Sequence, residues 1–427
     1  MKYTQNFKIM QVTESTLVIG VDIAKKKHYA RAFDWRGIEL DKVINFKSTF
    51  TGFNNFFDWT KEVAQRTGKD RIIIGIEPTG HYWYTFAQTV LDQGHMLVQV
   101  NPFHVKRAKE LDDNTPNKSD HKDPKTIALL VKDGRYQIPY IPTGMYMELR
   151  KANNLREEWL KKMWSIKNKV HRWLDIHFPE FLDVFSSWEG KTAIMVLEMM
   201  ALPAKIVELK AQQILSVWRQ EVKRGVGIKK AEALLKAATE SVGVRDGIEM
   251  AVYEIQLLMK EYKEIRKILD DLEEKLETVV FKMPGAQNLL EIKGIGVKTV
   301  AGFFAEVGDI NRFTHPDQII KLAGLNVREN SSGKHKGRTT ISKRGRSRLR
   351  ALLFRAILPL TGKNAEFNAL HKYNISQREN PLKKMQSLIA LCGKLIRVVY
   401  TIVTKNIKYD PMKMLSDIRR EQPALAA

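Results

Sequence analysis

Three short runs of apolar residues lie close together near the N-terminus, within residues 16–47, and polar or Gly-containing turns separate them. β-Branched and aromatic residues dominate these runs, which predicts a meander of three strands. The pattern then predicts a helix at about 50–67, a buried strand in RIIIGIEPTG, a helix at about 81–93 and a short strand in HMLVQVNP. This order predicts a mixed sheet covered by helices, in an α/β domain that ends near residue 140.

Two longer segments carry apolar stripes at helical spacing. The first predicts a long helix at about 145–175, with an apolar stripe formed by Ala152, Leu155, Trp159, Met163, Ile166, Val170 and Trp173. The second has the unbroken heptad spacing of a coiled coil, formed by Ile255, Leu258, Tyr262, Ile265, Leu269, Leu272, Leu276 and Val279. We expect the two helices to pack as an antiparallel hairpin or across a dimer.

The chain as a whole is expected to be α/β plus all-α. We place an α/β domain at 1–144, a coiled-coil region at 145–282 and a compact helical unit at 283–362, followed by a helical segment at 363–427. The coiled-coil region contains a helical insert at about 180–247, whose glycine-containing turns KRGVGIKK and ESVGVRDG indicate no function by themselves.

Charge narrows the choice of partner. The 427 residues hold 71 Lys or Arg against 48 Asp or Glu, a net charge of +23, which disfavours an enzyme for cationic substrates and favours a nucleic-acid partner. The single cysteine, Cys392, excludes an internal disulfide and a Cys-based zinc site. The N-terminus has no apolar signal region, and runs such as LIRVVYTIV are too short to cross a bilayer. We therefore expect a soluble, cytoplasmic protein.

Four acids could form a metal site. Asp22 ends the first predicted strand and Glu77 ends a later one, so both would project from the carboxyl edge of the sheet. Asp120 and Asp123 are three residues apart and would face the same way on a helix. Carboxylates suit Mg²⁺ or Mn²⁺, and two such ions can clamp a phosphoryl displacement. Alternatively, Asp22 is a turn former, and Asp120 or Asp123, before Pro124, is a helix cap.

A glycine turn, Gly294-Ile295-Gly296, joins two predicted helices in a helix-hairpin-helix pattern. Glycines at such a turn let backbone N–H groups approach a phosphate without reading sequence. The alternative is an ordinary turn that needs glycine only to end a helix.

A basic segment follows, with eight Lys or Arg and no acid between Lys334 and Arg350. Such density predicts binding that depends strongly on salt. The segment begins beside Ser331-Ser332-Gly333, where a hydroxyl could attack a phosphodiester if a base or a metal took its proton. The serines could equally belong to an ordinary loop.

The order of motifs resembles the insertion-sequence 110 group of transposases and the related Piv-type DNA invertases. The residues that carry this resemblance are VDIAKKKH, IEPTGHYW, VNPFHVKRAKE, KSDHKDPKTIA, IKGIGVKTVAGFFAEVG and KLAGLNVRENSSGKHKGRTTISKRGRSRLRALL. They cover most of residues 17–140 and 286–360. The 180–247 insert is longer than in compact members.

The resemblance implies a RuvC-like RNase H fold whose four acids, Asp22, Glu77, Asp120 and Asp123, bind Mg²⁺. It also implies a C-terminal domain whose serine nucleophile corresponds to Ser332, with Ser331 as the neighbouring possibility. Lys25 and Thr79 flank the acids. Expected nucleic-acid contacts are Gly294, Gly296, Lys298, Lys334, Lys336, Arg338, Lys343, Arg344, Arg346 and Arg348.

The partners implied are donor and target DNA, a structured bridge RNA that pairs with both, and further copies of the chain in a homodimer or homotetramer. The expected location is the cytoplasm of a bacterial or archaeal cell, with no membrane partner. Two alternatives remain open from the residues: a Mg²⁺-dependent Holliday-junction-type nuclease that uses water, and a non-catalytic nucleic-acid-binding scaffold.

Overall fold

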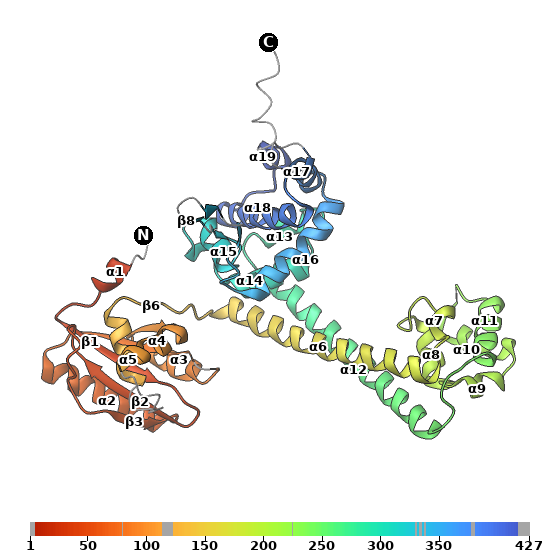
Figure 1. The fold of residues 1–427 in the computed structure, drawn as a ribbon, viewed down its shortest axis with the longest axis horizontal. Coiled ribbons are helices and arrows are strands. Elements are labelled where there is room, and N and C mark those ends of the chain that lie inside the picture. The colour runs from red at the N-terminus through yellow and green to blue at the C-terminus, as the bar shows by residue number, and fades with distance from the viewer. Residues whose placement is uncertain are drawn as a thin grey trace, which may run out of the picture. The chain divides into compact units, whose positions relative to one another are not determined.

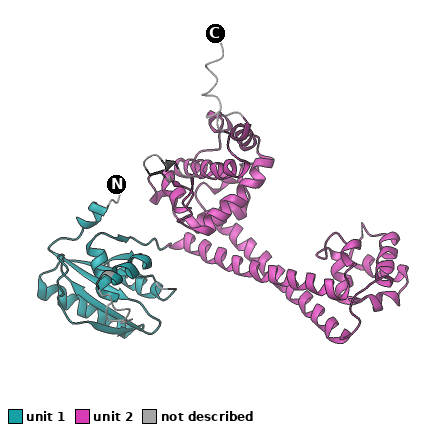
Figure 2. Ribbon diagram, viewed as in Figure 1, with its two compact units in different colours: residues 1–141 teal, residues 142–427 magenta. Residues whose placement is uncertain are grey.

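The computed structural model describes residues 5–78, 80–112, 123–223, 225–328, 331–332, 335–336, 339–376 and 381–416. The chain divides into two compact units, residues 1–141 and 142–427 (Figure 2). Each unit has its own buried cores, and each is described by itself.

Unit 1 is built on a six-stranded mixed sheet in the order β3-β2-β1-β4-β5-β6 (Figure 1). The pairs β1–β4 and β4–β5 are parallel, whereas β1–β2, β2–β3 and β5–β6 are antiparallel. The strands are β1 Thr16–Asp22, β2 Lys27–Phe33, β3 Ile44–Lys47, β4 Arg71–Ile76, β5 Met96–Val100 and β6 Tyr136–Gln137. This sheet confirms the predicted mixed α/β domain, including the meander at 16–47.

Helices cover both faces of the sheet because its central strands are apolar on both sides. Leu17, Ile19 and Val21 pack with α2 and α3, while Val18 and Ile73 pack on the opposite face with α4 and α5. The helices of this unit are α1 Gln5–Ile9, α2 Phe50–Thr67, α3 Trp83–Asp92, α4 Pro102–Asp112 and α5 Asp123–Lys132. The predicted helices at 50–67 and 81–93 correspond to α2 and α3.

Two long helices, α6 (Gly144–His177) and α12 (Ile248–Val280), run antiparallel in unit 2. Arg156 pairs with Glu273 at 3.2 Å near one end, and Trp173 Nε1 donates to the Ala251 carbonyl at 2.9 Å near the other. The apolar stripe of α12 is therefore buried within the chain. On α6 the stripe is buried from Met163 to Trp173, and Ala152 and Trp159 pack, partly buried, against the two helical cores. Leu155 is exposed, so the prediction is wrong at that position.

The insert between these helices is helical, as expected, and shares one apolar core with them. Its helices are α7 Phe181–Val184, α8 Lys191–Met199, α9 Pro203–Val207, α10 Ala211–Glu221 and α11 Ile228–Thr239. Three tryptophans, Trp173, Trp188 and Trp218, are almost fully buried in this core. Burial on this scale explains why so polar an insert folds as a compact body.

The rest of unit 2 forms a second helical core. Its helices are α13 Ala286–Leu290, α14 Val297–Val307, the 3₁₀ turn η1 Ile310–Arg312, α15 Pro316–Leu322, α16 Ser347–Lys363, α17 Ala365–Ser376, α18 Lys384–Lys405 and α19 Pro411–Met414. Two short antiparallel pairs lie between α15 and α16: β7 Val327–Arg328 with β10 Thr340–Ile341, and β8 Ser331–Ser332 with β9 His335–Lys336.

Helix α18 is longer and more apolar than the runs noted in the sequence. Within the part of the chain that the structure describes, it alone has the length and composition of a membrane span. Its buried side chains, including Leu391, Cys392, Leu395 and Ile396, pack in the core formed with α13 to α17. A core helix of a globular unit has the same features, so α18 is weak evidence for a membrane.

Candidate active site and nucleic-acid interface

Asp22 and Glu77 lie next to each other at the carboxyl edge of the sheet. Asp22 is the last residue of β1 and Glu77 directly follows β4. The residues before them, Val21 and Ile76, are register partners in the parallel β1–β4 pair. Neighbouring strands lie about 4.8 Å apart, so the two acids leave the sheet side by side.

The third acid, Asp123, reaches this edge because two glycines let α5 lie directly on the sheet. A Cβ added at Gly20 would lie 1.9 Å from the Pro124 carbonyl oxygen, and one at Gly75 would lie 2.5 Å from Val131 Cγ2. Because alternate residues of a strand face the same side, Asp22 shares with Gly20 the face that α5 covers. The first residue of α5 is Asp123, where a carboxylate also suits the helix dipole.

Electrostatics link Glu77 to the same helix end. Burial raises the pKa of the Glu77 carboxyl, the negative charge of Asp123 raises this pKa further, and the positive charge of Lys109 on α4 lowers it. Lys109 Nζ forms an ion pair with the Asp123 carboxylate. Glu77, Asp123 and Lys109 therefore form one charged cluster, in which the ammonium group neutralises the carboxylates.

These donors suit a hard divalent cation, because each offers carboxylate oxygens and Glu77 is partly removed from water. Among the residues that the structure describes, no three acidic, His or Cys side chains stand close enough to hold a metal ion. The expected fourth acid, Asp120, lies outside the described residues, as does Thr79. A cation bound here would compete with Lys109 for Asp123.

The β1–β2 turn beside Asp22 is held by a buried histidine. His28 on β2 lies among Phe46, Phe53 and Phe86, and its Nδ1 accepts a hydrogen bond from the Ala24 N–H at 3.3 Å. Burial lowers the pKa of His28 to about 4, so the ring is neutral near pH 7. His28 was not singled out from the sequence, although it is a polar residue at an inward position of an alternating strand.

In unit 2, the predicted glycine turn joins α13 to α14. Gly294 has φ +103°, a conformation that favours glycine, and its position against Leu360 leaves little space for a side chain. Gly296 is the N-cap of α14, and its carbonyl accepts hydrogen bonds from the N–H groups of Thr299 and Val300. The preceding helix, α13, has only five residues.

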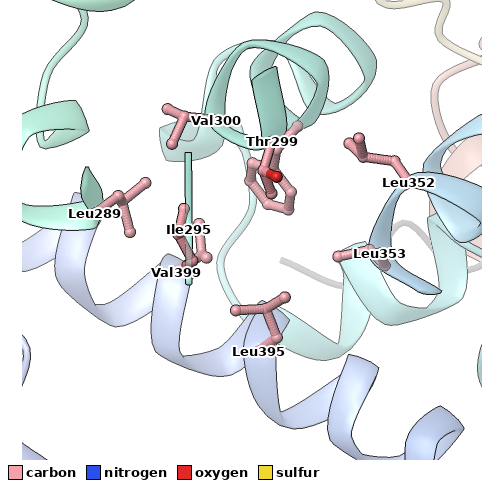
Figure 3. Close-up of a pocket in the computed structure, with 9 residues that line it drawn as sticks. Leu289, Ile295, Thr299, Val300, Leu352, Leu353, Leu395 and Val399 are labelled. Atoms are coloured by element: carbon pink, nitrogen blue, oxygen red, sulfur yellow. The ribbon is translucent and has the colours of Figure 1, made fainter. Parts of the chain in front are cut away.

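The underside of this turn is apolar core. Figure 3 shows Leu289, Ile295 and Val300 from the turn and its helices facing Leu395 and Val399 of α18. The cavity between them has a volume of about 20 Å³, room for about one water molecule. Only the outer side of the turn is available for a ligand. Lys298, an expected phosphate contact, forms an ion pair with Glu273 on α12 at 2.7 Å.

The candidate nucleophiles lie on a short hairpin. Ser332 pairs in register with His335, and Ser331 pairs with Lys336. The expected contacts Lys334 and Arg338 lie outside the described residues. His335 was not singled out from the sequence, although its position three residues after Ser332 is the spacing of a tight hairpin.

Beyond this hairpin, the basic residues fall into two groups. Arg346 Nη1 donates to the Glu306 carbonyl at 2.6 Å, and Arg348 Nη1 donates to Asn154 Oδ1 at 2.6 Å. Lys343 and Arg344 are exposed, and Lys343 holds a left-handed backbone with φ +52°. The structure thus leaves Lys343 and Arg344 on the surface and gives Arg346 a part in packing.

Two family models match the chain. One is a model of DEDD-type transposases of the IS110 group, described as "Transposase", and it matches residues 19–179. The other, described as "Transposase IS116/IS110/IS902 family", matches residues 286–372. Together they cover more than half of the chain. The chain belongs to the IS110 family of transposases.

Curated relatives of this IS110-family chain include the transposase for insertion sequence element IS1111A from Coxiella burnetii, 28% identical over 181 residues, which are 42% of this chain and 48% of that protein. The pilin gene-inverting protein of Moraxella bovis is 30% identical over 128 residues, 29% of this chain and 38% of that protein. A probable family 20 transposase of Pseudomonas aeruginosa is 27% identical over 161 residues, covering 36% and 47%. The chain spans less than half the length of each.

The two family matches coincide with the two candidate centres of this chain. The first includes the four acids, and the second includes the glycine turn, both serines and the basic segment. The insert from α8 to α11 lies in neither match. It nevertheless contains a second turn of the same local form: Gly225 has φ +78°, and Gly227 is the N-cap of α11, whose carbonyl accepts from Lys230 and Ala231.

Proposed function

We propose that this protein is a DNA transposase or site-specific recombinase that cuts and rejoins DNA strands through a serine nucleophile and a set of metal-binding acids. The observation that carries the proposal is the convergence of Asp22, Glu77 and Asp123 at one sheet edge, in a chain that also matches the second transposase model. We assign unit 1 a RuvC-like RNase H fold, which the mixed sheet and the acids at its carboxyl edge support.

Asp22, Glu77, Asp120 and Asp123 would hold Mg²⁺, or Mn²⁺ in its place. When bound, the cation would supply positive charge that stabilises the five-coordinate phosphorus of an in-line displacement. The carboxylates would hold the cation, and Lys109, already paired with Asp123, balances part of their charge in its absence.

In the proposed strand cleavage, the Ser332 hydroxyl attacks a DNA phosphorus atom. The Oγ–P bond forms as the P–O3′ bond breaks, and a carboxylate of the acidic centre receives the serine proton, which passes to the leaving 3′ oxygen. The products are a serine joined to a 5′ phosphate and a free 3′ hydroxyl. Attack of another 3′ hydroxyl on this linkage rejoins the strands and frees the serine without net hydrolysis.

We further propose donor and target DNA and a structured bridge RNA as the partners of this reaction, in an oligomer where the acidic centre of one chain serves the serine of another. The net charge of +23 supports a protein that holds several polyanions. Gly296, Lys343 and Arg344, which are exposed on unit 2, are suited to phosphate contacts.

The test is incubation of the purified protein with Mg²⁺, labelled DNA carrying the end junction of the element, and RNA copied from its flanking non-coding sequence. We expect a covalent protein–DNA adduct that requires RNA and is lost in Ser332→Ala and in Asp22→Asn, whereas Ser331→Ala retains it. Asp22→Asn should still bind RNA.

Cleaved ends that form without an adduct and survive Ser332→Ala would instead support a metal-dependent nuclease that uses water. Recombination that persists in Asp22→Asn and in the presence of a chelator would contradict the metal centre.

A further inference from the structure

The two long antiparallel helices, α6 and α12, carry net charges of opposite sign. Helix α6 contains eight Lys or Arg and four Asp or Glu, whereas α12 contains five Lys or Arg and nine Asp or Glu. From Trp159 to Trp173 on α6 there are five Lys or Arg and no acid. One helix of the pair is therefore cationic and the other anionic.

Only some of these cations have partners within the chain. Lys167 pairs with Glu189 at 2.7 Å, and Arg172 pairs with Glu254 at 3.4 Å. Lys161, Lys162 and Lys169 are exposed and, within the described part of the chain, have no acidic group at ion-pair distance. The Lys162 ammonium lies over the Trp159 ring, 3.8 Å from its centroid, but no carboxylate within the described residues neutralises the three lysines.

A large aromatic side chain lies among these lysines. The Trp164 side chain is 63% exposed, which is unusual for an indole that could have been buried in the neighbouring core. Lys161, Trp164 and Asn168 are spaced three and four apart, so they share one side of α6, opposite the buried stripe of Met163, Ile166 and Val170. The Lys167 ammonium lies 5.3 Å from the Trp164 ring centroid.

We propose that the exposed surface of α6 binds an unpaired segment of RNA, with a base stacked on the Trp164 ring, a backbone phosphate on Lys161 on the same side of the helix, and further phosphates on Lys162 and Lys169, which lie farther around the exposed surface. An exposed indole flanked by unpaired cations matches the chemistry of a single strand, whose bases are free to stack. In a duplex the base faces are covered, so Trp164 would have nothing to stack on. The proposal rests on the proposed function, in which RNA is the partner with unpaired segments.

The test compares binding of the full-length chain to a fluorescent, unstructured 12-nucleotide RNA and to a DNA duplex of the same length, in a buffer without Mg²⁺. We expect Trp164→Ala to weaken RNA binding about fivefold or more, because stacking contributes on the order of 1–3 kcal/mol per base. Trp164→Phe should restore most of the loss, and duplex affinity should not change. Tyr253→Ala is the matched control, since Tyr253 is an exposed aromatic, 56% accessible, on the acidic helix α12.

The lysines are tested by salt dependence. Replacing Lys161, Lys162 and Lys169 together by Gln should lower the slope of log affinity against log salt for RNA by up to about 2, since each single-strand phosphate contributes about 0.7. The same charge change on α12, at exposed Lys260, Lys267 and Lys275, is the control and should alter the slope much less.

Equal loss of RNA and duplex binding in Trp164→Ala would overturn the proposal, as would no loss of either. A changed oligomeric state of this variant with unchanged RNA affinity would assign the face to a second copy of the chain and also overturn it. Because the assay contains neither Mg²⁺ nor element-end DNA, its result is independent of whether the protein forms the covalent adduct.

Discussion

At the scale of residues, the acidic centre depends on side chains that do no chemistry themselves. Glycine at positions 20 and 75 removes the side chains that would keep α5 away from the sheet, and Lys109 supplies the charge that lets Glu77 and Asp123 stand close together. Among the basic residues, hydrogen bonds distinguish Arg346, which is bound to the Glu306 carbonyl, from exposed Arg344. The local surroundings of each residue, and not its type, decide its role.

His28 carries a prediction for acid stability. Its pKa is about 4 in the folded protein against about 6.5 when unfolded, so the unfolded state binds more protons between these values. The free energy of unfolding should therefore fall as the pH drops from 6.5 to 4, by up to about 3 kcal/mol. His28→Phe, which cannot titrate, should lose less stability than the wild type over this range in urea denaturation. His104→Phe, at an exposed position of the same unit, is the control, and an equal effect in both variants would refute the assignment.

At the scale of elements, helix starts and strand ends bring the site together. Asp22 ends β1, Glu77 follows β4 and Asp123 begins α5. Strands β1 and β4 belong to the sheet, and α5 packs on one face of it. In unit 2, glycine N-caps begin several helices, among them α14 and α11. The positions of these side chains are thus decided by where a strand ends or a helix begins.

Gly20→Ala tests how closely α5 must lie on β1. The added methyl group would meet the Pro124 carbonyl, so α5 must shift, and we expect destabilisation of about 1–3 kcal/mol together with loss of DNA cleavage. Thermal denaturation and the adduct assay measure the two effects. Gly362→Ala, in helix α16 with open space around it, is the matched control and should be neutral or stabilising. Normal stability and activity in Gly20→Ala would show that the contact is not required.

At the scale of the whole molecule, α6 and α12 bury their apolar stripes against each other within one chain. The sequence left open a hairpin or a dimer, because a heptad stripe requires a partner helix but does not say which chain provides it. The structure shows the hairpin within one chain. The insert connects the end of α6 to the start of α12 and shares an apolar core with both helices.

Cross-linking distinguishes these two arrangements in solution. In Arg156→Cys/Glu273→Cys, a short bismaleimide should join α6 to α12 within one chain, because the two side chains are paired at 3.2 Å in the structure. The native thiol should not interfere, since burial raises the pKa of Cys392 to about 12. Covalent dimers on a denaturing gel as the main product would mean that the helices pair between chains. Arg156→Cys alone is the control.

The sequence by itself determined much about this protein, because hydrophobic spacing and turn residues are local properties. The strands of the meander, the helices at 50–67 and 81–93 and the heptad stripe follow from such spacing. The predicted strand ends also placed Asp22 and Glu77 at the carboxyl edge of the sheet. The family was identified from the resemblance of six motifs, which occur in the family's order along the chain.

Only the tertiary structure decided what depends on contacts between distant segments. These include the ion pair of Lys109 with Asp123, the fit of α5 over Gly20, the engagement of Lys298 and Arg346 by acidic partners, and the exposure of Trp164. The turns at Gly225 and Gly294 both have a Gly-x-Gly sequence, but only the structure shows that the first glycine of each has a positive φ. Charge and close packing act across space, so residues far apart in sequence had to meet before their roles could be assigned.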